Sequence, residues 1–149
     1  SVFDTVFKSI HLSQNAQEFI SILQKKGILV GLVSGGFSPI VERLAKSLDI
    51  FYFSANQLEV KDGFLTGRLV GEIVTGQVKE STLEKWRTEL GLPKERTIAI
   101  GDGANDLLML KTAGRGIAFC AKEVVKAEIA CHVDTRDFLE VLPLIDFLE

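Results

Sequence analysis

Two carboxylates and an amide lie close together in the stretch Gly-Asp-Gly-Ala-Asn-Asp at positions 101–106. Asp102 comes just after the apolar run TIAI, and Asp106 follows four positions later, a spacing that places two side chains on one helix face. Carboxylate oxygens suit a hard cation such as Mg²⁺, and Asn105 adds a neutral amide that can orient a ligand. Because two carboxylates from one turn cannot complete six oxygen ligands, the stretch predicts one side of a metal site.

A simpler interpretation makes the same stretch an ordinary tight turn with Asp102 or Asp106 as a helix cap. For an isolated Gly-Asp-Gly we favour that interpretation. A strand before the turn and a helix after it, at the carboxyl edge of a parallel sheet, favour the metal site instead. A dinucleotide-binding fingerprint matches poorly, because Asp106 stands where its third glycine belongs.

A second candidate is LVSGGF at 32–37, an apolar strand pattern that ends in a hydroxyl and two glycines. Backbone amides in such a setting bind phosphate oxygens, and the Ser34 hydroxyl can add a donor. The alternative is a flexible entry to a helix, with Ser38 as N-cap and Pro39 at the first helical position. The residues alone leave these two interpretations equal.

Lys79 lies near the start of a helix expected over 79–90, where a cation opposes the helix dipole. A lysine that meets phosphate charge explains this position better than a surface lysine does. For Lys85, Lys94 and Lys111 we expect a solvated surface position. The histidines, His11 and His132, have no metal-binding or catalytic partner nearby in sequence, so we assign them no role.

These candidates require an α/β fold, because apolar strand patterns alternate with amphipathic helix patterns along the chain. The pattern predicts a doubly wound parallel sheet, in which ligands bind at the carboxyl ends of the strands. Residues 51–74 break the alternation and predict a β-hairpin turning at Lys-Asp-Gly, 61–63. Helices are expected near 12–27, 38–50, 79–90, 104–114 and 136–149, the last one interrupted at Pro143, and buried strands over 28–36 and 97–103.

The composition describes one globular domain of 149 residues, with 46% hydrophobic and 25% charged residues. A net charge of −3 without a basic cluster argues against nucleic acid or an anionic membrane as the main partner. No apolar run approaches the length of a membrane span. The two cysteines, Cys120 and Cys131, form no metal or disulfide pattern, so we expect a reducing compartment, the cytoplasm.

In this order, the motifs resemble those of the haloacid dehalogenase superfamily, and most closely its phosphoserine phosphatase branch. The resemblance runs from about Leu12 to the end of the chain. Its most specific pieces are VSGGF at 33–37, AN-L-VKDG-LTG across 55–67, Lys79, GDGAND at 101–106 and GIAFCAK at 116–122.

The resemblance implies a fold and a set of roles. The fold is the Rossmann-like α/β core of this superfamily, and the activity is Mg²⁺-dependent hydrolysis of O-phosphoserine through an aspartyl-phosphate, a step of serine biosynthesis. Asp102 would bind Mg²⁺, and Asp106 would hold the metal's water ligands. Ser34, the Gly35 amide and Asn105 would contact the phosphoryl group or substrate. Lys79 would offset negative charge during phosphoryl transfer.

One motif of the superfamily, the nucleophilic Asp-x-Asp-x-Thr/Val, does not occur in the 149 residues. Asp4 in VFDTV is a poor substitute, because Val6 stands where the second aspartate belongs and cannot transfer a proton. The resemblance places residues 1–12 at the end of a small cap domain. We therefore expect a catalytic core without its central first strand and most of its cap, inactive alone and marginally stable. It would be completed by the missing N-terminal segment of the same protein or by a strand from a second copy in a homodimer.

Three functions stay open on the sequence. The first is a phosphoserine phosphatase core. The second is a related phosphatase acting on another small phosphate ester. The third is a non-catalytic module that binds Mg²⁺ or phosphate.

Overall fold

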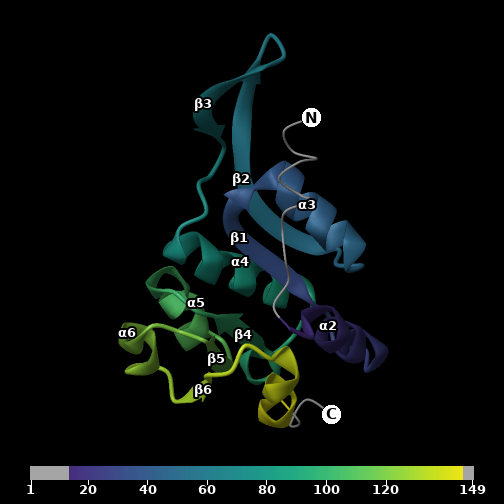
Figure 1. The fold of residues 1–149 in the computed structure, drawn as a ribbon, viewed down its shortest axis with the longest axis vertical. Helices are drawn as coiled ribbons and strands as arrows, with labels where there is room; N and C mark the ends of the chain where they lie inside the picture. Colours follow the sequence, from purple (N-terminus) through teal and green to yellow (C-terminus); the bar gives the residue numbers. More distant parts are fainter. Residues whose placement is uncertain (1–13, 146–149) are drawn as a thin grey trace. The chain divides into compact units, whose positions relative to one another are not determined.

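The computed structural model describes residues 14–145 (Figure 1). The chain divides into two compact units, and each is described by itself. Within the described residues, unit 1 comprises 20–74 and unit 2 comprises 14–19 and 75–145. The expected cap-domain end at 1–12, together with Asp4 and His11, lies outside the described residues.

Unit 1 is a three-stranded sheet with helical cover. Its sheet has the order β1-β2-β3, with β1 and β2 parallel and β2 and β3 antiparallel. The β2–β3 hairpin extends away from the rest of unit 1 in Figure 1, and its turn residues Asp62 and Gly63 have φ of 51° and 81°, as a two-residue type I′ turn requires. The hairpin predicted for 51–74 is thus confirmed. The elements are α2 (Ala16–Lys25, whose first residues belong to unit 2), β1 (Gly31–Phe37), α3 (Ser38–Ser47), β2 (Tyr52–Lys61) and β3 (Phe64–Val70).

The core of unit 1 forms where α3 packs on the sheet. Val41, Ala45 and Leu48 recur at helical spacing and are 5%, 0% and 8% exposed. Leu32 of β1 and Phe53 of β2 pack against Ala45, Leu48 and Ile50. The hairpin adds little to this core, since Phe64 at its tip is 77% exposed.

Unit 2 is a parallel sheet of order β4-β5-β6 with helices between the strands. Its core gathers Leu110, Ala118 and Val125, which are 2%, 0% and 0% exposed. The elements are α4 (Gly76–Glu89), β4 (Ile98–Gly101), α5 (Leu107–Thr112), β5 (Arg115–Phe119), α6 (Glu123–Lys126) and β6 (Cys131–Val133), with 3₁₀ turns at Lys94–Arg96, Ala104–Asp106 and Phe138–Leu144.

The α/β class with parallel strands is confirmed, but three local expectations were wrong. The first strand begins at Gly31 and is half-exposed rather than buried. Phe37, not Ser38, caps α3, and no side chain makes a capping bond there. The last helix, Phe138–Leu144, is a 3₁₀ helix, and Pro143 disfavours an α-helix there because its ring would clash with the carbonyl four residues earlier.

In the described part of the chain, the first strand of each sheet, β1 and β4, has a neighbouring strand on one side only. Within residues 14–145, β1 pairs only with β2 and β4 pairs only with β5. No helix among the described residues is long and apolar enough to cross a membrane.

Candidate functional site

Asp102 lies at the carboxyl end of β4, the strand that the sequence predicted before it. Its side chain is exposed, and within residues 14–145 no hydrogen bond or ion pair engages its carboxylate. Its backbone is held, because the Lys122 N–H donates to the Asp102 carbonyl oxygen at 3.3 Å. The carboxylate therefore projects from a fixed backbone and is available to a ligand.

Asp106 differs from Asp102, because it is buried and fully engaged. It is 5% exposed, and its Oδ2 accepts the N–H groups of Asp102 at 3.0 Å and Gly103 at 3.1 Å. Its Oδ1 accepts a hydrogen bond from Lys79 Nζ at 2.6 Å. One carboxylate thus closes the Gly-Asp-Gly turn and holds the lysine.

Lys79 is a buried lysine, as its position in the sequence predicted. It is 7% exposed and forms a salt bridge with Asp106. Burial of either charge alone would be expensive, so removal of one partner typically costs about 3–5 kcal/mol of stability. The surface position predicted for Lys85, Lys94 and Lys111 is also confirmed.

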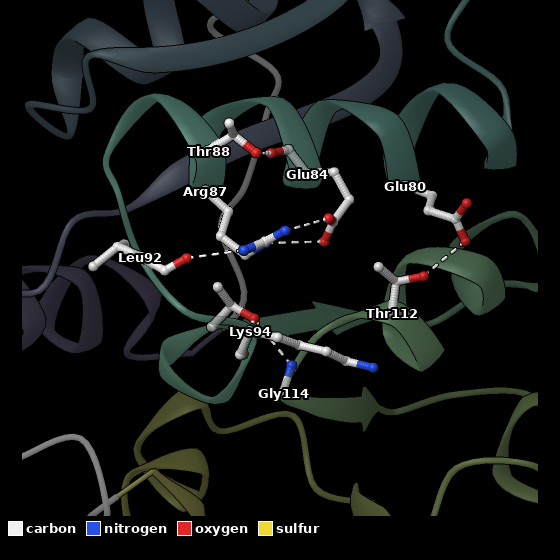
Figure 2. A network of polar contacts seen from close by, with 9 residues as sticks. Glu80, Glu84, Arg87, Thr88, Leu92, Lys94, Thr112 and Gly114 are labelled. Carbon is white, nitrogen blue, oxygen red and sulfur yellow. Dashed lines mark hydrogen bonds and ion pairs between the residues drawn. The ribbon is translucent and has the colours of Figure 1, made fainter.

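Several contacts fix the helix that carries Lys79. Helix α4 starts at Gly76, three residues earlier than expected, and the Thr75 hydroxyl caps it by accepting the Val78 N–H at 3.3 Å. Figure 2 shows two further ties. The Thr112 hydroxyl of α5 donates to Glu80 at 2.7 Å, and Arg87 donates to the Leu92 carbonyl oxygen at 3.0 Å.

Gly101 must be a glycine because the Asp106 side chain lies very close to its backbone. A β-carbon at Gly101 would lie 2.5 Å from the Asp106 β-carbon, which no real structure accommodates. Asn105 is exposed, and the start of α4 packs against its backbone, since a β-carbon at Gly76 would lie 3.1 Å from the Asn105 carbonyl oxygen. Unit 2 therefore brings together Lys79, Asp102, Asn105 and Asp106, as the sequence suggested.

The other predicted site residues, Ser34 and Gly35, belong to unit 1 and lie on β1. Ser34 Oγ accepts the Gly36 N–H at 2.9 Å. Gly35 is exposed, and a β-carbon there would meet no atom within 4 Å. We call residues 34–36 the Ser-Gly-Gly loop. It presents a hydroxyl and open backbone, the groups that bind phosphate oxygens.

The sequence analysis quoted Asn56 within the motif AN-L-VKDG-LTG but gave it no role, and the structure shows it as a buried amide that bonds to this loop. It is 6% exposed, and its Nδ2 donates to the Gly35 carbonyl oxygen at 2.9 Å. The available signal was an asparagine inside an apolar strand pattern. His132 Nδ1 lies 3.0 Å from Asp134 Oδ2 on the surface.

The donor chemistry of Asp102 fits Mg²⁺. Among the described residues no group of three or more His, Cys, Asp or Glu could hold a metal. Mg²⁺ does not need such a cage, because it keeps several waters and is usually bound by one or two carboxylates with substrate phosphates. One free carboxylate at a strand end meets that requirement.

Comparisons with known proteins identify the family of this chain. The profile of the haloacid dehalogenase-like hydrolases matches residues 2–111. A phosphoserine phosphatase of Streptococcus thermophilus is 50% identical over 146 residues, which are 98% of this chain and 68% of the relative. One of Methanocaldococcus jannaschii is 41% identical over 142 residues, 95% of this chain and 67% of the relative.

Solved structures show the same likeness. A substrate-bound phosphoserine phosphatase complex matches with a TM-score of 0.91 and 40% identity, over 96% of this chain and 68% of that one. A phospho-aspartyl intermediate analogue of phosphoserine phosphatase matches with a TM-score of 0.90 and 40% identity, over 96% and 68% of the two chains. By these matches, the chain belongs to the haloacid dehalogenase-like hydrolase family.

Proposed function

We propose that this chain carries the metal-binding and phosphoryl-binding groups of a Mg²⁺-dependent phosphoserine phosphatase. One observation carries the proposal. The buried Lys79–Asp106 pair fixes the Gly-Asp-Gly turn through Asp106 Oδ2 and leaves the neighbouring Asp102 carboxylate exposed. The two relatives described above, at 50% and 41% identity, are both named phosphoserine phosphatase. Their names support O-phosphoserine as the substrate.

The reaction class is phosphomonoester hydrolysis through an aspartyl-phosphate. A carboxylate oxygen forms a bond to phosphorus while the bond to the serine oxygen breaks, and serine leaves with a proton. Water then attacks phosphorus and restores the carboxylate as inorganic phosphate departs. The nucleophilic Asp-x-Asp of this chemistry does not occur in the 149 residues, so the proposal concerns the groups that bind and position.

Lys79 is proposed to stabilise negative charge on the transferring group. Its ammonium has three N–H donors, of which Asp106 Oδ1 takes one at 2.6 Å. The ion pair fixes the ammonium in a buried setting, where a preorganised charge acts more strongly than in water. Asp106 thereby acts through its neighbours: it holds Lys79 and the backbone of Asp102.

Asp102 is proposed to bind Mg²⁺, which when bound supplies positive charge to phosphoryl oxygens. The Ser34 hydroxyl and the Gly35 amide are proposed to bind the phosphoryl group, and Asn105 to contact the substrate. Location in the cytoplasm and pairing of two copies stay predictions.

The test is phosphate release by the full-length protein with Mg²⁺, on O-phosphoserine and a panel of other small phosphate esters. We expect O-phosphoserine to give the highest kcat/KM. A higher value for another ester would assign a different substrate, and release from none would favour a binding module. Residues 1–149 alone should release no phosphate, because they contain no Asp-x-Asp. Phosphate release by residues 1–149 alone would instead make Asp4 the nucleophile to test.

A further inference from the structure

Asn56 is a buried amide whose two polar atoms both have partners within unit 1. Its Nδ2 donates to the Gly35 carbonyl oxygen at 2.9 Å, and its Oδ1 accepts the Val74 N–H at 2.7 Å. It is 6% exposed. Burial of an amide is unfavourable unless it is hydrogen-bonded, so both bonds are needed to keep Asn56 in place.

The bond to Gly35 fixes a peptide plane of the Ser-Gly-Gly loop. The Gly35 carbonyl and the Gly36 N–H belong to one peptide group. Asn56 holds the carbonyl side, and Ser34 Oγ accepts the N–H at 2.9 Å on the other side. Two successive glycines have wide backbone freedom, and these two bonds remove much of it.

The Asn56 side chain bonds to the Gly35 carbonyl where the regular pairing of β1 with β2 is interrupted. The register of β1 against β2 is continuous up to Val33 and shifts before Phe37, so the Ser-Gly-Gly loop falls in the irregular part of the pairing. Asn56 lies opposite Phe37. The Ser-Gly-Gly loop therefore lies within β1 but outside its regular pairing with β2, and Asn56 still satisfies the Gly35 carbonyl.

The bond to Val74 reaches the end of the same unit. Val74 is the last residue of unit 1 and is 8% exposed. Its N–H bond to Asn56 fixes the segment that returns from the β2–β3 hairpin. One amide thus connects the Ser-Gly-Gly loop with the end of this return segment.

We propose that Asn56 is a positioning residue of the phosphatase reaction: it sets the peptide geometry with which the Ser-Gly-Gly loop binds the phosphoryl group. It touches no reacting atom and acts through the Gly35 carbonyl. The inference rests on the proposed function, which assigns phosphoryl binding to Ser34 and Gly35. The competing interpretation is a buried amide that only stabilises the fold.

Thr97 provides a matched control for that interpretation. It is 7% exposed, donates through its hydroxyl to the Lys94 carbonyl oxygen at 2.6 Å and accepts the Gly114 N–H at 3.0 Å. It therefore resembles Asn56 in burial and in having one donated and one accepted bond. It precedes β4, at the opposite end of the strand from Asp102.

The experiment compares Asn56→Asp with Thr97→Val in the full-length protein. Aspartate keeps the shape of Asn56 and an acceptor for Val74, but it loses the donor to Gly35 and places an oxygen against a carbonyl. We expect N56D to raise the inhibition constant of inorganic phosphate and the KM for O-phosphoserine about tenfold, since a lost bond to a buried group is worth about that factor. We expect T97V to lower the unfolding temperature, though by less than N56D because it buries no charge, and to leave both constants within about twofold of wild type.

A double-mutant cycle with Ser34→Ala tests the route of the effect. If Asn56 acts through the Ser-Gly-Gly loop, N56D should raise the phosphate inhibition constant less than about threefold in the S34A background, because the loop is already impaired. Equal effects of N56D and T97V on the two constants, or a full multiplication of the N56D and S34A effects, would overturn the inference while the proposed function stands. A wild-type protein that releases no phosphate from O-phosphoserine would overturn the proposed function and the inference with it.

Discussion

The Gly-Asp-Gly turn of unit 2 and the Ser-Gly-Gly loop of unit 1 are fixed in opposite ways. The turn is held by charge: Asp106 binds Lys79 at 2.6 Å and two backbone amides. The loop is held by neutral groups, Ser34 Oγ on one side and the Asn56 amide on the other. A buried ion pair and a pair of neutral hydrogen bonds are thus two different ways to fix one backbone segment.

The difference predicts which substitutions damage the fold as well as the reaction. In the turn, Lys79 and Asp106 are buried and paired, so their loss affects both. Asp102 and Gly35 are exposed, so their loss should affect function alone.

Lys79→Ala should have the largest effect. Removal of one preorganised electrostatic group typically lowers turnover by ~10²–10³-fold. The substitution also leaves the Asp106 carboxylate buried without its ion pair, a loss of about 3–5 kcal/mol. Turnover of O-phosphoserine and denaturant unfolding measure the two effects. Wild-type turnover in a folded K79A protein would show that Lys79 does not act on the phosphoryl group.

Asp102→Asn should separate the two effects. Its carboxylate is exposed and no described residue bonds to it, so unfolding should change by no more than about 0.5 kcal/mol. Loss of the charged ligand should lower turnover about 10–100-fold at ordinary Mg²⁺ levels, and high Mg²⁺ should partly restore it. Near-normal activity at ordinary Mg²⁺ would remove Asp102 from the metal site.

Gly35→Ala should leave the loop folded and weaken phosphate binding. A β-carbon there meets nothing within 4 Å in the protein, so stability should be kept. The added methyl would occupy the open side from which a phosphoryl group must approach the backbone. The inhibition constant of inorganic phosphate should rise. An unchanged constant would place the phosphoryl group elsewhere.

The smallest effect concerns the α4 surface shown in Figure 2. Arg87 donates to Glu84 at 2.7 Å, and this hydrogen bond lowers the pKa of the Glu84 carboxyl from its usual 4.5. A lowered pKa in the folded state stabilises the protein above pH 4.5, and the contribution is lost as the pH falls through the folded-state value. Arg87→Ala should therefore lower the unfolding temperature slightly at pH 7, and the difference from wild type should shrink at pH 3. A difference that grew toward acid pH would show that this pair is not its cause.

The sequence predicted the charged region better than the neutral one. Lys79, Asp102 and Asp106 have residue types that are expensive to bury or that bind metals, and two of them lie within one short motif. Their chemistry is visible without a structure. The prediction that Lys79 is not a surface lysine followed from its unfavourable place near a helix start, although α4 begins at Gly76.

Asn56 could not be found in the same way. Its partners Gly35 and Val74 lie 21 and 18 positions away, and only the parallel pairing of β1 with β2 brings the first of them near. The parallel α/β class and the hairpin followed from periodicity and from Lys-Asp-Gly, since both are local signals. The form of the last helix did not follow from the sequence, because a pattern that contains Pro143 fits either a broken α-helix or the 3₁₀ helix that forms.

One measurement tests whether the Gly-Asp-Gly turn binds the metal and the Ser-Gly-Gly loop binds the phosphoryl group. It is the Mg²⁺ concentration that gives half-maximal phosphate release from O-phosphoserine. It should be determined for full-length wild-type, D102N and S34A proteins at saturating substrate. We predict that D102N raises this concentration at least about tenfold, as loss of a metal-site group typically does. S34A should leave it within about twofold of wild type while raising the KM for O-phosphoserine. A Mg²⁺ requirement that is unchanged in D102N, or that rises equally in both variants, would contradict the assignment of the metal to the Gly-Asp-Gly turn and of the phosphoryl group to the Ser-Gly-Gly loop.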